Sequence, residues 1–296
     1  MTSDITLFVN PTAGRGRGAR AAQPAARVLR EAGLRVRTVL GADAGDALSR
    51  ARAAVSGGTG ALVAVGGDGM TSLALQAVAG TGTPLGVVAV GTGNDFAQAT
   101  GLPVRDPRAA ARLIAASLKS DGGRPVDVGL AGDTYFGTVL ASGFDSRVND
   151  RGNRMRWPAG RFRYDLAMVA ELAGLRTIPY RVRLDDGPER EIEATLIAVG
   201  NGSSYGGGMR ICGGARLDDG LFDVTVVGPC SRATLLRVFP RVYRGTHLSH
   251  PAVTTHRVAK ISLAAPGLTG YADGEPLGSL PLTAVTVPGA VRLLGG

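Results

Sequence analysis

The chain has 296 residues, 44% of them hydrophobic and 19% charged, which excludes a disordered protein and predicts one or two globular domains. No apolar run approaches the ~20 residues of a membrane-spanning helix, and the N-terminus lacks the basic and apolar regions of a signal peptide. The formal net charge of +9 comes almost wholly from arginine, which favours phosphorylated ligands or an anionic membrane surface. No nucleic-acid-binding motif accompanies this charge, so we expect no nucleic-acid partner. Two cysteines cannot form a disulfide framework, and we therefore expect a cytoplasmic protein.

Short apolar runs alternate with helix-like stretches over about the first 125 residues. We expect strands at residues 5–10, 34–40, 61–65 and 85–90, with helices at 20–32, 45–56, 70–79 and 107–118. Strands that are apolar without alternation belong to parallel sheets covered on both faces. The pattern therefore predicts an α/β N-terminal domain with a parallel sheet over residues 1–124.

From residue 125 the chain changes to many short strand candidates separated by turns. These lie at residues 126–130, 134–140, 180–184, 192–199, 221–227, 258–264 and 284–287, with helices at 163–175 and 232–243. Such spacing favours an antiparallel arrangement. We predict a mainly antiparallel β-sandwich second domain over residues 125–287, with residues 288–296 able to pack back on the first domain.

Three glycine-rich turns follow predicted strands of the first domain, at residues 10–18 (NPTAGRGRG), 66–69 (GGDG) and 91–95 (GTGND). Ligands bind outside the carboxyl ends of the strands in open α/β sheets, and glycine lets backbone N–H groups approach an anion. These turns predict a nucleotide phosphate site. A P-loop NTPase is excluded, because GxxxxGK[ST] is absent.

Two of these turns carry a carboxylate, Asp68 and Asp95. A carboxylate beside phosphate oxygens needs a cation or a hydroxyl between them, so one interpretation is Mg²⁺ binding, directly or through water. The other is an Asx turn or a helix N-cap, which aspartate often forms. The residues alone leave both open.

Motifs across nearly the whole chain resemble the diacylglycerol kinase catalytic-domain family. They are NPTAG, GGDG and PLGVVAVGTGNDFA in the first half, and VGNGSSYGGGMRICGGARLDDGLFDV and YADGEPLG in the second. This family comprises soluble bacterial lipid kinases, with sphingosine, ceramide and NAD kinases as relatives. The resemblance implies an NAD kinase/diacylglycerol kinase-like fold. It also implies ATP- and Mg²⁺-dependent phosphorylation of a hydroxyl on a diacylglycerol-like or sphingoid lipid.

The resemblance also implies site residues. Those matching the nucleotide-binding motifs are Asn10, Pro11, Thr12, Gly14, Arg15, Gly41, Gly66, Gly67, Asp68, Gly69, Met70, Thr71, Ser72, Thr92, Asn94 and Asp95. Asp273 and Glu275 match the catalytic carboxylates, one as the proton acceptor and one as a partner of Mg²⁺. Catalytic Mg²⁺ would involve Asp68, Asp95 and Glu275, directly or through water. A structural Mg²⁺ would bind Asp219 and the carbonyl oxygens of Arg216 and Leu221.

The chain departs from the family pattern at several of these positions. Met70 stands where a threonine is usual, Ser72 and Leu73 replace polar residues, and Gly41 replaces a threonine. A phosphate-facing hydroxyl would be lost at position 70. These departures favour an alternative, a nucleotide-binding regulatory protein with little or no kinase activity. A kinase for a soluble substrate such as NAD is a further alternative.

A basic segment with aromatic residues predicts transient contact with an anionic membrane surface, at the inner face, in addition to the lipid substrate. The alternative is a solvated basic loop over the cleft, and a homodimer is left open. The residues concerned are Arg151, Arg154, Arg156, Trp157, Arg161, Phe162 and Arg163.

Overall fold

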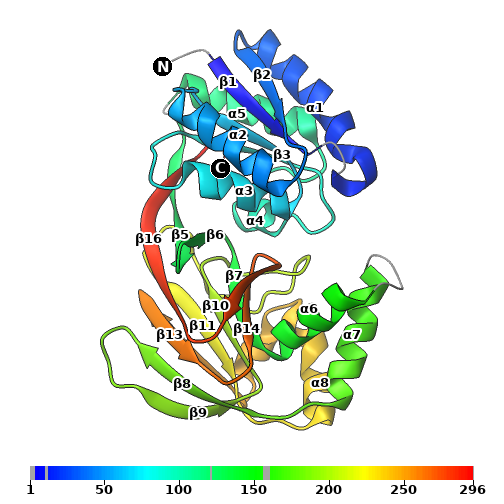
Figure 1. Cartoon of the computed structure of the whole chain (residues 1–296), viewed down its shortest axis with the longest axis vertical. Helices are drawn as coiled ribbons and strands as arrows, with labels where there is room; N and C mark the ends of the chain where they lie inside the picture. Colours follow the sequence, from blue (N-terminus) through cyan, green and yellow to red (C-terminus); the bar gives the residue numbers. More distant parts are fainter. Residues whose placement is uncertain (1–3, 11–12, 121, 156–160, 296) are drawn as a thin grey trace.

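The computed structural model describes residues 4–10, 13–120, 122–155 and 161–295, with the side chains of all of these except 13–17 and 161–165. The chain forms an α/β domain and a β-rich domain that lie end to end (Figure 1). None of the helices in the described residues is both long and apolar enough to cross a membrane.

The first domain contains the parallel sheet that the sequence predicts. Its strands are β1 (Asp4–Val9), β2 (Arg35–Leu40), β3 (Leu62–Gly66) and β4 (Leu85–Ala89), in the order β2-β1-β3-β4. Its helices are α1 (Ala13–Glu31), α2 (Ala44–Ser56), α3 (Asp68–Val78), α4 (Asp95–Ala99) and α5 (Pro107–Lys119). Helices α2 and α3 pack on one face of the sheet and α1 and α5 on the other, which buries every residue of β3 and β4.

The second domain is an antiparallel β-sandwich, which confirms the predicted fold class. One sheet has the order β12-β11-β10-β7-β14-β15, and the other contains β16-β13-β8-β9 with β5 and β6. Its strands are β5 (Arg124–Ala131), β6 (Thr134–Phe136), β7 (Val139–Gly143), β8 (Ile178–Leu184), β9 (Arg190–Ala194), β10 (Leu196–Gly200), β11 (Phe222–Val227), β12 (Val253–Val258), β13 (Lys260–Ala264), β14 (Thr269–Ala272), β15 (Glu275–Ser279) and β16 (Leu282–Leu293). Between the sheets lies an apolar core in which the rings of Phe136 and Phe222 stack at 5.7 Å.

Three helices flank one side of this sandwich (Figure 1). They are α6 (Phe144–Arg154), α7 (Arg161–Ala173) and α8 (Arg232–Val242). Helices α6 and α7 share a small apolar cluster that includes Phe144, Val148 and Ala167. Helix α6 continues directly from β7, so the position of this helical layer is set by the central sheet.

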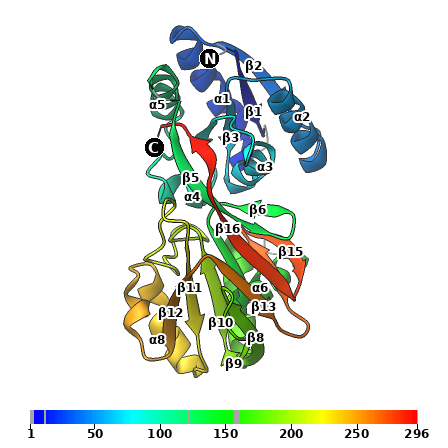
Figure 2. The ribbon, with the colours of Figure 1, turned by 90° about the vertical axis from the view of Figure 1, so that its left-hand side faces the viewer.

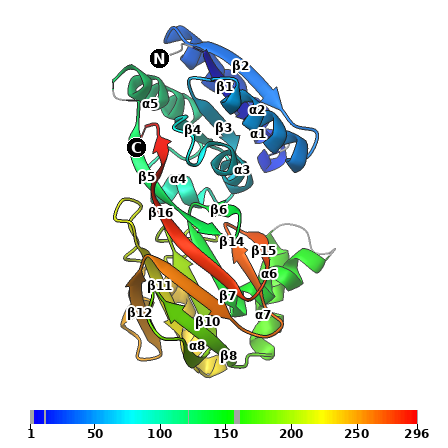
Figure 3. The same cartoon turned by 60° about the vertical axis from the view of Figure 1, so that its left-hand side comes forward.

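The last strand, β16, belongs to both domains. It pairs antiparallel with β5 along the second domain, and its residue Leu293 pairs with Leu85 of β4. The N–H of Leu294 donates to the carbonyl oxygen of Leu85 at 2.8 Å, and both Leu293 and Leu294 are fully buried. Figures 2 and 3 show β16 and β5 crossing together from one domain to the other. The C-terminal segment therefore extends the sheet of the first domain.

Asp127 of β5 fixes this crossing. Its carboxylate accepts the N–H of Gly289 at 2.8 Å and the N–H of Gly220 at 2.7 Å, and the side chain is buried. Gly289 lies where the register of β16 shifts and has a φ of 60°, a conformation that glycine adopts without strain. One buried carboxylate thus ties the irregular part of β16 to the turn that precedes β11.

Candidate active site

The glycine-rich loops after β3 and β4 lie against each other at the carboxyl end of the parallel sheet. A Cβ atom on Gly91 would be 2.5 Å from the Cα of Gly67, so the two backbones approach too closely for any other residue. Helix α3 begins at Asp68 behind Gly67 without a side-chain cap. The N–H groups of Met70 and Thr71 donate to the carbonyl oxygen of Gly67, so the N–H groups of Asp68 and Gly69 are the ones that can face an anion. This geometry suits a phosphate group.

Asp68 joins the two loops. Its carboxylate oxygens accept the backbone N–H groups of Asn94 and Asp95, each at 2.7 Å. Asn94 has the left-handed φ of 61°, and its side-chain amide bonds the backbone N–H and carbonyl of Gly91. These bonds join two separate loops and do not form a local Asx turn, and the N-cap of α3 is Gly67, so Mg²⁺ binding by Asp68 stays a prediction. Each carboxylate oxygen retains a further lone pair for a cation or its water.

Asp95 reaches from the first domain into the second. Both of its carboxylate oxygens lie 3.0 Å from the N–H of Gly207, and one accepts the N–H of Gly208 at 3.1 Å. The pKa of Asp95 is raised to about 6: burial is the largest cause, repulsion by Asp68 and Asp273 adds to it, and the hydrogen bonds from Gly207 and Gly208 oppose it. The side chain is buried, so its negative charge lies in a place where opposite charge would be favoured.

Asp273 occupies the turn between β14 and β15 with a φ of 51°. Its carboxylate accepts the N–H of Gly137 at 2.7 Å, the N–H of Thr138 at 2.9 Å and the hydroxyl of Thr138. Burial raises its pKa, and these donors oppose the rise. Glu275, at the start of β15, is exposed, and no hydrogen bond to its carboxylate is found in the described residues. Partial burial of the carboxyl group of Glu275 also raises its pKa.

The three aspartates concentrate negative charge at one place. Asp68 and Asp273 both raise the pKa of Asp95 electrostatically, and among the side chains that the structure describes no basic group acts on Asp95 in the opposite direction. Among the described residues no three acidic, histidine or cysteine side chains form a complete metal cage. Mg²⁺ commonly binds one or two carboxylates and takes its other ligands from water and substrate phosphates. The residues present therefore fit Mg²⁺ bound together with a nucleotide.

The comparisons with known proteins agree with this geometry. Residues 4–130 match the diacylglycerol kinase catalytic domain, and residues 138–295 match the YegS C-terminal NAD kinase beta sandwich-like domain. A diacylglycerol kinase of Mycobacterium tuberculosis is 44% identical over 98% of this chain and 94% of its own length. The chain belongs to the family of diacylglycerol kinases and YegS-like lipid kinases.

Relatives that are more distant in sequence share the fold. A crystal structure of a diacylglycerol kinase from Bacillus anthracis has a TM-score of 0.74 at 22% identity and covers 99% of this chain and 96% of that one. An NAD kinase from Archaeoglobus fulgidus, solved in complex with ATP, has a TM-score of 0.55 at 13% identity, with 99% of this chain and 93% of that one covered. These structures place the lipid kinase fold close to that of NAD kinases.

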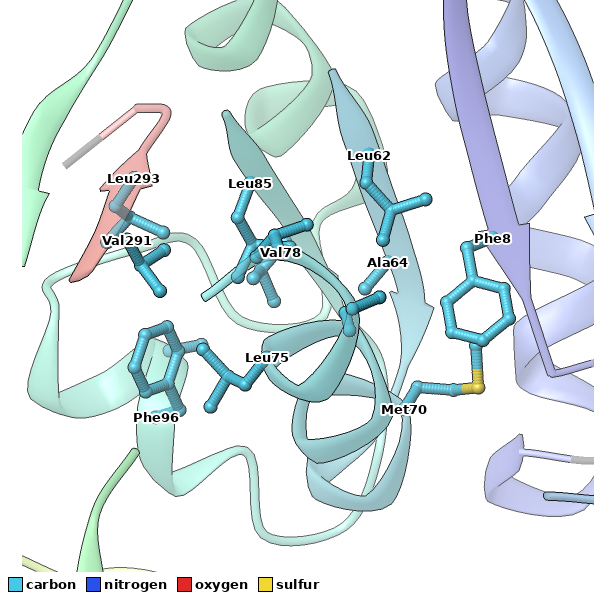
Figure 4. Close-up of a cluster of buried hydrophobic side chains, with 14 of the residues drawn as sticks. Phe8, Leu62, Ala64, Met70, Leu75, Val78, Leu85, Phe96, Val291 and Leu293 are labelled. Carbon is cyan, nitrogen blue, oxygen red and sulfur yellow. The ribbon is translucent and has the colours of Figure 1, made fainter. Parts of the chain in front are cut away.

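Two departures from the family motif pack in an apolar cluster of the first domain. Met70 is buried, and Figure 4 shows its sulfur beside the ring of Phe8. Leu73 packs against the same cluster. The side chain of Met70 therefore packs in the apolar cluster of the first domain, and a nucleotide contact at position 70 stays a prediction. Thr71 is also buried, and its hydroxyl faces the carbonyl oxygen of Gly67 at 3.5 Å.

The remaining nucleotide-binding candidates are spread along the loop edge. Asn10 directly follows β1 and donates its N–H to Val65, which keeps the first loop beside the second. Gly41 packs against α2, where a Cβ atom would lie 2.4 Å from the Cβ of Ala47. Gly66 ends β3, Gly69 and Ser72 lie in α3, Thr92 is exposed, and Gly14 and Arg15 lie in the first turn of α1. Pro11 and Thr12 lie outside the described residues.

The predicted structural cation site has an arginine at its carboxylate. Asp219 pairs with the guanidinium of Arg257 and accepts the N–H of Leu221 at 3.1 Å. Arg216 forms an exposed ion pair with Asp218 at 3.1 Å. Arg257 therefore supplies positive charge at this turn, and a Mg²⁺ ion bound by Asp219, Arg216 and Leu221 stays a prediction.

Several functional positions were missed by the sequence analysis. Thr138 holds Asp273, Gly207 and Gly208 bind Asp95, and Arg105 donates to the carbonyl of Thr92 at 3.3 Å. Asn201 is fully buried and donates to the carbonyls of Asp127 and Gly137, both at 2.9 Å. The glycine triplet at residues 206–208 and an asparagine directly after a buried strand were the available signals.

Proposed function

We propose that the protein is an ATP-dependent lipid kinase that phosphorylates a hydroxyl of a diacylglycerol-like lipid. The observation that carries this proposal is the meeting of two sets of groups at one place. The first domain contributes the glycine loops with Asp68 and Asp95, and the second contributes Asp273 and Glu275. The direct contact of Asp95 with Gly207, and its electrostatic interaction with Asp273, bring the two sets together.

The chemistry is a direct transfer between two oxygens. The acceptor hydroxyl oxygen attacks the γ-phosphorus of ATP, the bond to the β,γ-bridging oxygen breaks, and ADP leaves. Mg²⁺ would neutralise the phosphate charge when bound beside Asp68 and Asp95. We assign the proton of the acceptor hydroxyl to Glu275, because three donors already hold Asp273 and none binds Glu275 in the described residues.

Asp273 acts as the organising carboxylate in this proposal. Its hydrogen bonds fix the backbone of the turn that presents Glu275, through contacts with Gly137 and Thr138 between β6 and β7. In this assignment Asp273 positions the turn of the DGE motif, and Glu275 accepts the proton of the acceptor hydroxyl.

The test is phosphate transfer from ATP to a panel of acceptors in mixed micelles. Diacylglycerol, sphingosine and ceramide are compared, with NAD as the soluble acceptor and Glu275→Gln as the inactive control. We expect labelled phosphate in diacylglycerol only with the wild-type protein. Transfer to NAD in the absence of lipid would identify a soluble-substrate kinase instead. Nucleotide binding without transfer to any acceptor would favour the regulatory alternative.

A further inference from the structure

Helix α3 of the first domain binds strand β6 of the second through the side chain of Gln76. Its amide group bonds both backbone groups of Tyr135: Nε2 donates to the carbonyl oxygen at 2.6 Å, and Oε1 accepts the N–H at 2.9 Å. Two such bonds reproduce the pairing of one strand with another, so they fix both the distance and the register between helix and strand. Strand β6 pairs with β5, and Figure 3 shows it at the junction of the two domains.

The strand that Gln76 binds leads directly into the residues that hold Asp273. Tyr135 precedes Gly137 by two residues, or about 7 Å of extended chain. The N–H groups of Gly137 and Thr138 donate to the carboxylate of Asp273 at 2.7 and 2.9 Å. The position of Asp273 therefore depends on where residues 135–138 lie.

The segment after β6 is also held on its other sides. Gly137 is buried, and a Cβ atom on it would lie 2.6 Å from the ring of Phe96 in α4. The buried side-chain amide of Asn201 donates to the carbonyl oxygen of Gly137 at 2.9 Å, and the N–H of Asn201 donates to that of Thr138 at 2.8 Å. A displacement of β6 is therefore transmitted to Asp273, because the segment between them is tightly packed.

At its other end, α3 joins this contact to the glycine loops. The helix begins at Asp68, whose carboxylate accepts the N–H groups of Asn94 and Asp95 in the loop after β4. Gln76 lies about two turns later, roughly 12 Å along the helix axis. A helix keeps this distance, so α3 and residues 135–138 form a continuous connection between Asp68 and Asp273.

We propose that Gln76 is a positioning residue for the phosphate transfer. Through Tyr135 it sets the distance between the glycine loops, which bind the nucleotide, and the DGE turn, which faces the acceptor. The inference rests on the proposed function, because it assigns Gln76 to that same site. Reacting atoms must approach to about 3–3.5 Å, and a misplacement of about 1 Å can lower a rate by roughly 10²-fold. A contact that fixes one domain on the other can therefore control the rate without touching either substrate.

The test compares substitutions of Gln76 with the same substitutions of Gln23, which lies on the exposed side of α1. Gln76→Glu keeps an acceptor for the N–H of Tyr135 but turns a charged oxygen toward its carbonyl oxygen. Gln23→Glu makes the same change of charge away from the junction. Gln76→Met keeps the length of the side chain without burying a charge, and it replaces Gln76→Glu if thermal unfolding shows that the latter does not fold. Gln23→Met is its control.

We expect kcat for transfer to diacylglycerol to fall at least about tenfold in the Gln76 variants. The Kd of ATP should stay within about twofold of the wild-type value, because the nucleotide loops are unchanged. The Gln23 variants should match the wild-type protein in both quantities. An unchanged kcat, or an equal loss of ATP affinity, would overturn the inference.

A double-mutant cycle tests whether Gln76 acts through Asp273. If it does, the Gln76 substitution should lower kcat less in an Asp273→Asn background than in the wild-type protein. Losses that multiply independently would contradict a connection between the two residues.

Hydrogen exchange distinguishes failure of this inference from failure of the proposed function. It is measured without ATP or lipid, so it does not depend on activity. The amides of Tyr135, Gly137 and Thr138 should exchange at least about tenfold faster in Gln76→Met than in Gln23→Met. If the wild-type protein transfers no phosphate, the proposed function fails, and faster exchange still supports the connection between α3 and the DGE turn. Unchanged exchange overturns that connection whatever the activity.

Discussion

Asp95 of the first domain accepts the N–H of Gly207 of the second, at 3.0 Å from each of its carboxylate oxygens. This side-chain contact couples the two domains beside the glycine loops. The acceptor must be a carboxylate or a similarly shaped group, because the N–H groups of Gly207 and Gly208 both point at it.

Asp95→Asn should therefore lower phosphate transfer by roughly 10²-fold or more, because it removes charge at the expected Mg²⁺ site and turns an NH₂ group toward the glycine N–H groups. The measurement is the initial rate at saturating ATP and diacylglycerol. Asp186→Asn, on a fully exposed aspartate, is the matched control and should behave as wild type. A rate within threefold of that of the control would show that Asp95 is not needed for phosphate transfer.

Asp68→Asn should destabilise the protein, not only inactivate it. Asparagine offers one acceptor oxygen where two charged ones now receive the N–H groups of Asn94 and Asp95. A hydrogen bond to a charged group contributes about 1.5–3 kcal/mol, so denaturant titration should show a loss of roughly 2 kcal/mol in unfolding free energy. An inactive variant with wild-type stability would indicate that the carboxylate acts on the nucleotide alone.

The two DGE carboxylates should separate in their effects. Glu275→Gln should lower the rate by roughly 10²–10⁴-fold without changing the melting temperature, because no hydrogen bond depends on it in the described residues. Asp273→Asn should lower both the rate and the melting temperature, because three donors lose their charged acceptor. Matching losses of stability in both variants would contradict this division.

The pH profile of the rate gives a second check on Glu275. A base works only when it is deprotonated, and the pKa of Glu275 is raised by partial burial. Activity should therefore fall on the acidic side at a pH above the ordinary glutamate range, and Glu275→Gln should abolish that limb. If the residual activity of the variant still falls at the same acidic pH, the fall reports the protonation of another group.

Met70→Thr should destabilise the first domain. The methionine side chain is buried against Phe8, and threonine both leaves space and places a hydroxyl in an apolar cluster. A loss of about 1–3 kcal/mol in unfolding free energy is expected, with no increase in kcat. Met70→Leu, which keeps the volume, is the control. Faster turnover by the threonine variant would show that position 70 reaches the nucleotide after all.

The buried carboxyl group of Asp145 should make the free energy of unfolding decrease as the pH rises. Burial raises its pKa to about 7, and one of its carboxylate oxygens is buried without a hydrogen-bond partner in the described residues. The folded state then binds a proton more tightly than the unfolded chain, so unfolding free energy decreases from about pH 4 to pH 7. Asp145→Asn should remove a decrease on the order of 2–4 kcal/mol between these values. A variant with the wild-type pH profile would exclude this source.

Local patterns in the sequence were sufficient for the fold class and for the loop edge. Continuous apolar strands require covered faces, and parallel strands must place their following loops at one edge, so residues 66–69 and 91–95 could be predicted to meet. The orientation of Met70 was also within reach, because Met70, Ala74 and Ala77 recur at helical spacing and all are buried on one face of α3. The glycine-rich motif drew attention to ligands instead.

Long-range contacts could not be predicted from one sequence. Nothing near Asp219 indicates Arg257, which lies in the neighbouring strand β12, and nothing near Asp95 indicates Gly207. Strand β16 was predicted only for residues 284–287, because Pro288 and Gly289 interrupt the apolar pattern. Strands β9 and β10 were expected as one strand, but the chain changes sheet at Thr195 between them.

The position of β16 limits when the first domain can complete its fold during synthesis. The sheet that carries the glycine loops receives its last neighbour from the end of the chain, at Leu293 and Leu294. During synthesis the edge of β4 therefore stays unpaired until the final strand has left the ribosome. A chain that stops short of Leu293 would contain every loop and carboxylate of the site and still lack a finished sheet to support them. Ribosome-bound chains cut at successive lengths should become resistant to protease in their first domain only once that strand has emerged.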